Sequence, residues 1–192
     1  MIHKFEQKRR VKAAHLFPHK STQNFMARIF GTKDELSHPR NAMLMADYIE
    51  EQFDKGRIAL VPDMSEDATD EEWRKWRENE MVRQYKIRIL DKSASAIVNE
   101  VIEGGRYHGL KIIELDDKPV GFRNEYRTRA RYLYYHYLEC IDAQIVGHPE
   151  RKQEIILNEI KKPVWPTMGS CIRKEPPDGV HRRIGTGDGT PS

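Results

Sequence analysis

Two short apolar segments separated by a polar loop, with a helix pattern directly after the second, set the strongest constraint on how this chain folds. The first segment, KAAHLFP, covers residues 12–18, and the second, RNAMLMADYIEEQFDKGRIALVP, covers residues 40–62. Pro18 ends the first segment because proline has no amide proton to give to a continuing strand. Gly56 ends the helix pattern, since glycine readily adopts the left-handed conformation found at helix ends.

The two segments predict a strand, a loop, a second strand, a helix and a third strand. The expected limits are residues 10–17 for the first strand, 41–45 for the second, 47–55 for the helix and 58–61 for the third strand. Asp47 is expected to cap the helix, and Ile49 and Phe53 lie one turn apart on its apolar side. The loop carries Phe25 and Met26, which predict one helical turn.

Further strands and helices are predicted along the rest of the chain. Residues 84–90 place Tyr85, Ile87 and Ile89 on one face, which is the period of a half-buried strand. Residues 124–146 carry an apolar stripe at i, i+3 and i+4, the pattern of an amphipathic helix. Weaker signals predict helical packing of Trp73 and Trp76, a strand over 111–115, a turn at 116–117 leading into a hairpin, and a helix over 150–161.

The length of 192 residues favours one main domain and a tail, because ordinary domains hold about 100–200 residues. We expect an α+β fold in which residues 1–62 form a core and residues 63–161 form an extension packed on it as one unit. Residues 162–192 are expected to be disordered, since they bury too little apolar surface to offset their ordering entropy. A small sheet is expected from the strands near Ile58, Ile87 and Ile112.

Composition excludes several classes of protein. Every apolar run is far shorter than the roughly 20 residues of a membrane helix, and the charged N-terminus does not resemble a secretory leader. Cys140 and Cys171 lack the spacing of a zinc or disulfide framework. We therefore expect an intracellular protein, cytoplasmic or nuclear, with no membrane partner and no organic cofactor. The net charge of +3 permits a phosphate-bearing partner without requiring one, and the oligomeric state stays open.

Three polar residues stand at defined points of the N-terminal pattern. His15 ends the first strand, Asn41 opens the second, and Glu50 lies on the helix. An imidazole, with an ordinary pKa of about 6.5, can act as a base near neutral pH. A carboxylate can bind a divalent cation. Each residue alone also has a structural explanation, as a surface histidine, a turn residue and a solvated acid, but together they could form a metal-dependent hydrolytic centre.

The segments AHLFP, NAMLM and QFDKGRIALVP resemble the three-part signature of HNH endonucleases, a family built on a ββα-metal finger. The resemblance covers residues 12–62. A later segment, GFRNEYRTRARYLYYHYL, is similar to uncharacterised HNH-type proteins of filamentous fungi. The combination of the three parts is specific, whereas AHxxP alone is too short to indicate a family.

The resemblance implies hydrolysis of phosphodiester bonds in DNA with one divalent metal ion and one histidine base. His15 would deprotonate water, Asn41 would hold the imidazole ring through a hydrogen bond, and Glu50 would bind the metal ion. The ion would offset charge on the scissile phosphate and on the leaving oxygen.

The chain departs from the family pattern at two positions. Glu50 stands where the family has histidine, which favours Mg²⁺ or Mn²⁺ over zinc. Ala14 stands where many members place a second metal ligand, and alanine cannot coordinate. Asp54, one turn beyond Glu50, could complete the site or could brace the turn into Gly56. The strand that usually precedes the first histidine is also not found, so we expect either a fragment or a fold that has lost it.

Arg127 and Arg131 are candidates for contacts with nucleic-acid phosphates, because they lie one turn apart beside a tyrosine-rich face. The favoured interpretation of this segment is structural, with the tyrosines in the core and the arginines at the surface or paired with acids in 66–72. Two other functions compete with cleavage of DNA. One is a noncatalytic HNH-like protein with residual nucleic-acid or protein binding, and the other is a protein-interaction module that uses the tyrosine face.

Overall fold

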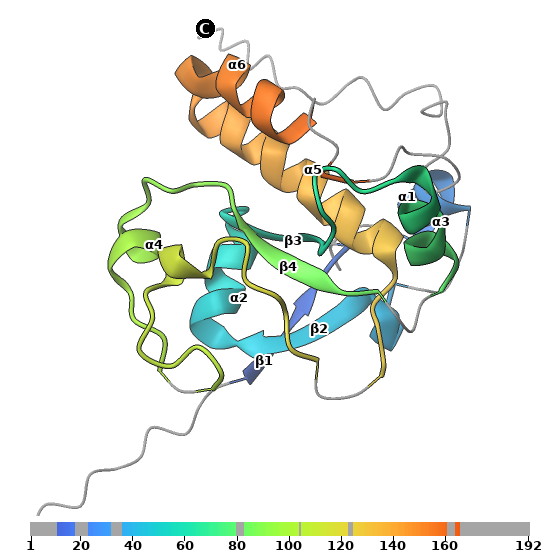
Figure 1. The fold of residues 1–192 in the computed structure, drawn as a ribbon, viewed down its shortest axis with the longest axis horizontal. Helices are drawn as coiled ribbons and strands as arrows, with labels where there is room; N and C mark the ends of the chain where they lie inside the picture. Colours follow the sequence, from blue (N-terminus) through green and yellow to red (C-terminus); the bar gives the residue numbers. More distant parts are fainter. Residues whose placement is uncertain are drawn as a thin grey trace, which may run out of the picture.

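The structure is a computed structural model of the chain, and it describes residues 11–17, 23–31, 36–79, 83–103, 105–122, 125–160 and 164–165. The fold is α+β, as expected, with two separate two-stranded antiparallel sheets and one long helix (Figure 1). The first sheet pairs β1 (Val11–His15) with β2 (Ala42–Ala46), and the second pairs β3 (Ile58–Pro62) with β4 (Tyr85–Ile89). Among the described helices, none is long and apolar enough to cross a membrane.

The first sheet and the helix α2 (Asp47–Asp54) form a ββα unit in the expected order. Lys12 lies opposite Met45, and Ala14 lies opposite Met43. Because opposite residues share a face of the sheet, these side chains lie on the side that α2 covers. The helix α1 (Gln23–Phe30) and the 3-10 helix η1 (Pro39–Asn41) belong to the connection between the two strands.

The long helix α5 (Ala130–Gly147) packs across the second sheet. All residues of β3 are buried: Ala59 and Val61 pack with α5, and Ile58 packs on the opposite side against apolar residues of 97–115. After the 3-10 turn η4 (Pro149–Arg151), the helix α6 (Lys152–Ile155) and the π-helical turn η5 (Ile156–Ile160) fold back along α5 (Figure 1).

The helix α2 ends at Asp54, one residue before the expected limit, and its N-cap is not Asp47 as expected. Ala46 is the N-cap, and the Asp47 carboxylate accepts a hydrogen bond from the amide of Tyr48 instead of capping the helix. Gly56 has a φ of 66°, and a Cβ added to it would lie 3.3 Å from the Cα of Cys140. This residue must therefore be glycine both for its conformation and for the close approach of α5.

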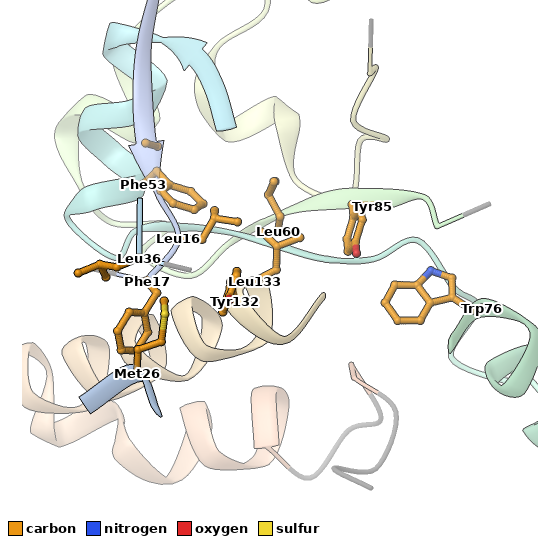
Figure 2. Packing of buried hydrophobic residues seen from close by; sticks show 11 residues of the cluster. Leu16, Phe17, Met26, Leu36, Phe53, Leu60, Trp76, Tyr85, Tyr132 and Leu133 are labelled. Atoms are coloured by element: carbon orange, nitrogen blue, oxygen red, sulfur yellow. The ribbon is translucent and has the colours of Figure 1, made fainter. Parts of the chain in front are cut away.

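A hydrophobic cluster joins the ββα unit to α5 (Figure 2). Leu16 and Phe17, which follow His15 directly, are fully buried in it. The ring of Phe17 lies 4.8 Å from that of Tyr135 and 5.3 Å from that of Phe30, measured between centroids. The chain is therefore anchored immediately after the candidate base. The buried members that Figure 2 labels are Leu16, Phe17, Met26, Leu36, Phe53, Leu60, Trp76, Tyr85, Tyr132 and Leu133.

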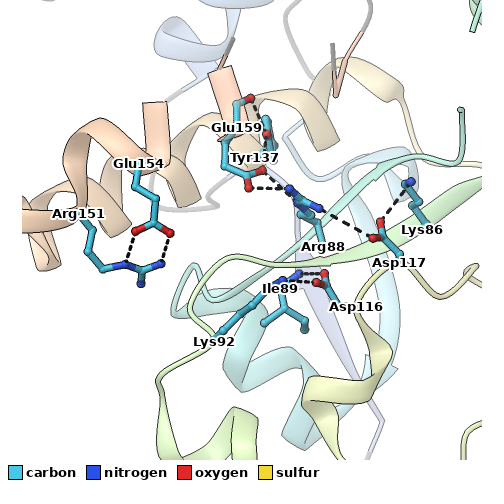
Figure 3. Close-up of polar contacts among 10 residues, drawn as sticks. All are labelled: Lys86, Arg88, Ile89, Lys92, Asp116, Asp117, Tyr137, Arg151, Glu154 and Glu159. Carbon is cyan, nitrogen blue, oxygen red and sulfur yellow. Dashed lines mark hydrogen bonds and ion pairs between the residues drawn. The ribbon is translucent and has the colours of Figure 1, made fainter. Parts of the chain in front are cut away.

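A polar network ties β4 to the C-terminal turn η5 (Figure 3). The Arg88 guanidinium donates two hydrogen bonds to the Glu159 carboxylate, at 2.8 and 3.1 Å. The Tyr137 hydroxyl donates to the backbone oxygen and the carboxylate of Glu159, at 2.9 and 3.0 Å. Burial and the nearby carboxylate raise the pKa of Tyr137. On the other side, Lys86 lies 3.2 Å from Asp117, which also approaches Arg88.

The expected strand over 111–115 is wrong, and so is its place in a sheet with β3 and β4. The segment forms the 3-10 helix η3 (Ile112–Leu115), in which Ile112 and Leu115 are both buried. Two buried residues three apart suit a helical turn, because in a strand they would point to opposite faces. The expected hairpin is not formed by the described residues either. Instead, Asp117 and Val120 donate backbone hydrogen bonds to β4.

The helices of the second half also differ from expectation in their limits. The long helix begins at Ala130, and the described residues 125–129 before it are not helical. The helix expected over 150–161 is divided into η4, α6 and η5. The helix α3 (Asp70–Glu78) has a capping box between Thr69 and Glu72 and buries Trp73 and Trp76, which confirms the packing role of the tryptophans. A short helix, α4 (Ser95–Asn99), follows β4.

Some expectations fall on residues outside the described part of the chain. These are the start of the first strand at Arg10 and the disorder of 162–192, apart from Val164 and Trp165. The ring of Trp165 packs against the rings of Tyr134 and Trp76, at centroid distances of 5.3 and 6.0 Å.

Candidate active site

His15 is the last residue of β1, and its side chain is exposed. It lies opposite Ala42, on the face of the first sheet that also carries Val11 and Leu44. Leu16 and Phe17, which follow it, are buried in the core. They hold the backbone in place directly after His15, while its imidazole is exposed at the end of β1. A surface position of this kind gives water and a large substrate access to the ring.

Asn41 is fully buried and holds the chain on both sides of the β1–β2 connection. Its amide nitrogen donates to the backbone oxygens of Phe17 and Leu36, at 3.1 and 2.8 Å, and its side-chain oxygen accepts from the amide of Phe17 at 2.8 Å. In addition, its backbone oxygen accepts from the amide of Leu16. Both amide protons are thus donated to backbone oxygens, so Asn41 has none left to donate to the imidazole. Asn41 therefore positions His15 through the backbone.

Glu50 and Asp54 lie one turn apart on α2, so both carboxylates project from one side of the helix. Burial and the negative charge of Glu50 raise the pKa of Asp54, while the charges of Lys12 and His15 act in the opposite direction. The candidate base and both candidate metal ligands are therefore near enough to interact electrostatically. Along β1, however, alternation puts His15 on the opposite face of the sheet from Lys12 and Ala14, which face α2.

Lys12 is a charged neighbour of Glu50 that the sequence analysis missed. Its Nζ lies 2.9 Å from Oε2 of Glu50, and the side chains are 52% and 13% exposed, respectively. The hydrogen bond to Glu50 is the main reason why the pKa of Lys12 is raised. A signal was present in the sequence, since period-2 alternation puts Lys12 and Ala14 on the same face of β1. A lysine on the face that α2 covers needs an acidic partner from that helix.

Ala14 occupies the position where many HNH endonucleases place a metal ligand, and here it belongs to the core. Its side chain is 1% exposed and packs in the same cluster as Phe53. The inner face of β1 thus offers a methyl group and an ammonium group toward α2, in place of a ligand.

The donor atoms present fit a hard, hydrated cation better than zinc. No group of three His, Cys, Asp or Glu side chains in the described part of the chain is arranged to hold a metal ion. Glu50 and Asp54 supply carboxylate oxygens, and Mg²⁺ is commonly bound by one or two carboxylates with water and substrate phosphate. Zinc ordinarily takes three or four protein ligands, including nitrogen or sulfur.

His136 of α5 is a second residue that the sequence did not point to, and it contacts α2 at Phe53. Its ring stacks on that of Phe53, and Nε2 lies 3.3 Å from the backbone oxygen of Phe53. Burial lowers the pKa of His136 to about 4, so the ring is neutral at physiological pH. Near the end of α5, the side-chain amide of Gln144 donates to the backbone oxygen of Gly56, two residues after the end of α2. The helix that carries both carboxylates is therefore fixed to α5.

Arg127 and Arg131 are both partly buried and engaged with aromatic rings. The guanidinium of Arg127 lies 4.0 Å from the ring centroid of Phe122, and its Nε donates to the backbone oxygen of Arg83. The guanidinium of Arg131 lies 5.4 Å from the ring centroid of Phe30 and donates to the hydroxyl of Tyr132. These contacts give both arginines a structural role, but through aromatic rings rather than at the surface or with the acids in 66–72 as expected.

Comparison with known proteins gives one family. Residues 1–61 match the family model described as HNH endonuclease. The matched segment contains β1, β2, α2 and nearly all of β3, and therefore every candidate site residue except the two arginines. No curated protein and no solved structure matches the chain in these comparisons.

Proposed function

Because residues 1–61 match the family model described as HNH endonuclease, we propose that the chain is a metal-dependent nuclease that hydrolyses phosphodiester bonds in DNA. His15 is the general base that accepts a proton from the attacking water. Asn41 is a positioning residue that fixes the backbone on either side of that histidine. Glu50 and Asp54 hold the divalent cation, with Mg²⁺ or Mn²⁺ favoured by their oxygen atoms.

One observation supports this assignment more than any other. The charges of Glu50 on α2 and of His15 on β1 both act on the carboxylate of Asp54, which supports a site formed by these two elements. A bound divalent cation would supply positive charge at the scissile phosphate and the leaving oxygen. The exposed imidazole of His15 is accessible to water, and its anchored backbone limits its movement. General base catalysis of this kind contributes roughly 10²–10⁴-fold to a rate.

The proposal is tested by nicking of supercoiled plasmid DNA in Mg²⁺ or Mn²⁺. His15→Ala is expected to lower the nicking rate at least about 100-fold. His108→Ala is the matched control, because His108 is also exposed but lies in the 105–109 turn, outside the ββα unit. Nicking that EDTA abolishes, that His15→Ala removes and that His108→Ala keeps is the expected pattern. Equal nicking by the His15→Ala protein would assign the activity to a contaminant and reject the role of His15.

A second candidate function is favoured by two observations at the same site. Ala14 is buried where a ligand would stand, and Lys12 already neutralises Glu50. These features suit an HNH-fold protein that binds nucleic acid without cleaving it. It would show salt-sensitive DNA binding, with log affinity falling as log salt rises, and no nicking in either metal. The plasmid assay and a binding titration together separate the two functions.

A further inference from the structure

We propose that Lys12 is an exchangeable counter-ion, which holds Glu50 in the absence of metal and transfers to the phosphate backbone of DNA once a divalent cation is bound. The inference rests on the proposed function, because it assumes that Glu50 and Asp54 bind the cation. It adds a role for a residue outside the catalytic set and predicts that metal binding and DNA binding are coupled.

The position of Lys12 makes the exchange possible. It lies on the α2 side of β1, opposite Met45, and its Nζ contacts Oε2 of Glu50 at 2.9 Å. The Glu50 side chain is only 13% exposed, whereas that of Lys12 is 52% exposed. The lysine is thus the accessible member of the pair, and rotation of its four-carbon side chain can free the carboxylate without moving either backbone.

Charge provides the driving force for the exchange. With Lys12 in place, one of the two carboxylates is already neutralised. A divalent cation on Glu50 and Asp54 would stand within a few ångströms of the ammonium group, and like charges at that distance repel. The released ammonium would then neighbour the phosphate that the same cation attracts. Each ligand therefore favours the other, and the coupling must be reciprocal in the two affinities.

A second lysine–glutamate pair beside the site is a matched control. Lys55 pairs with Glu51, four residues before it and next to Glu50 in the sequence. The two side chains are 47% and 57% exposed, so this pair lies in solvent. Its removal changes the net charge of the protein as much as removal of Lys12 does, but it frees no candidate ligand. A difference between the two variants therefore separates local exchange from long-range electrostatics.

The first measurement is Mn²⁺ affinity without DNA, taken from the electron paramagnetic resonance signal of unbound Mn²⁺. Lys12→Met is expected to bind Mn²⁺ roughly fivefold more tightly than the unmodified protein, the upper range for loss of an accessible ion pair. Lys55→Met is expected to change the affinity much less. Lys12→Arg keeps the positive charge and is expected to bind Mn²⁺ no more tightly than the unmodified protein. Tighter binding by Lys12→Met alone would therefore be due to loss of the charge and not to the change of side chain.

The second measurement is DNA binding in the His15→Ala background, where the proposed base is absent. In EDTA, Lys12→Met is expected to leave the affinity unchanged, because Lys12 is held by Glu50. In Mn²⁺, the same substitution is expected to weaken binding and to lower the salt slope by about one phosphate contact. Circular dichroism of each variant confirms that it is folded.

The outcomes separate the inference from the proposed function. Equal Mn²⁺ affinity for Lys12→Met and the unmodified protein, with binding lost in Glu50→Gln, would overturn the exchange and leave the metal site standing. Equal gains from Lys12→Met and Lys55→Met would also overturn it. Absence of Mn²⁺ binding in both the unmodified and Lys12→Met proteins would reject the metal site itself, and the exchange with it.

Discussion

The imidazole ring of His136 lies parallel to the phenyl ring of Phe53, with centroids 3.6 Å apart and planes 5° from parallel. Phe53 belongs to α2 and directly precedes Asp54, so this contact joins the long helix α5 to the helix that carries the candidate ligands. On its own helix, Nδ1 of His136 lies 3.4 Å from the sulfur of Cys140, and burial raises the pKa of that thiol. The contact is therefore between neutral groups, and it depends on the histidine staying unprotonated.

Acid is expected to destabilise the protein through His136. Burial lowers its pKa from 6.5 to about 4 in the folded state, so between these values the unfolded chain binds more protons. The effect of His136 leaves the free energy of unfolding unchanged above pH 6.5. As pH falls from 6.5 to 4, this free energy decreases by about 3 kcal/mol. Urea unfolding between pH 7.5 and 4 measures the loss, and nuclear magnetic resonance of the ring protons measures the pKa directly.

His136→Phe separates this effect from the titration of carboxylates. Phenylalanine can keep the stacking on Phe53 but has no proton to gain. The variant is expected to lose less stability than the unmodified protein between pH 6.5 and 4. An identical pH dependence in the two proteins, or a ring pKa near 6.5, would contradict the buried neutral state.

The sequence could predict what depends on neighbouring residues and could not predict what depends on distant ones. The limits of α2 and β3 follow from Gly56 and from local apolar patterns, and the structure agrees to within one residue. The strand expected over 111–115 is wrong because Ile112 and Leu115 share one core, which the short local pattern could not show. Spacing alone cannot show which side chains will meet across the fold.

The candidate site divides in the same way. His15, Asn41, Glu50 and Asp54 stand at signature positions and could be chosen from the sequence. The contact of Lys12 with Glu50 spans 38 positions, and that of His136 with Phe53 spans 83. Alternation along β1 could indicate the face that Lys12 occupies, but no local pattern names Glu50 as its partner or His136 as that of Phe53. The actual partners of Asn41 were also out of reach, because they are backbone atoms whose positions depend on the whole connection between β1 and β2.

Asn41→Ala is expected to destabilise the protein by about 3 kcal/mol, because it leaves the buried amide and oxygen of Phe17 and the oxygen of Leu36 without the side chain that binds them. Nicking should fall with it even under conditions where the variant is folded, since the segment around His15 loses its support. Urea unfolding and the plasmid assay at low temperature measure the two effects.

Asn99→Ala is the control for that substitution. Asn99 is exposed at the end of α4, and its side chain donates one hydrogen bond to Ser95. Its replacement is expected to change stability by less than about 0.5 kcal/mol. Similar losses from the two alanine variants would mean that the buried amide of Asn41 has no special structural role.

Arg88→Met is expected to cost about 2 kcal/mol, between the values for surface and buried ion pairs. Arg88 and Glu159 are 20% and 11% exposed, and removal of the guanidinium would leave a carboxylate largely shielded from water (Figure 3). Arg151→Met is the matched control, because Arg151 also makes two hydrogen bonds to a glutamate, Glu154, but at an exposed site. Its removal should have little measurable effect, and an equal effect of both substitutions would deny the network its role in holding η5 on β4.

Two glycine-to-alanine substitutions are expected to change stability in opposite directions. Gly56→Ala should cost more than about 1 kcal/mol, because φ at this position is 66° and the added methyl group would press on the backbone of Cys140 at 3.3 Å. Gly147→Ala, at the end of α5, meets no atom within 4 Å and should stabilise the protein by up to about 1 kcal/mol through helix propensity. Thermal unfolding of both variants measures the difference. If Gly56→Ala were as stable as Gly147→Ala, the close packing of the turn after α2 against α5 would be wrong, and with it the account of how α5 holds the acidic helix in place.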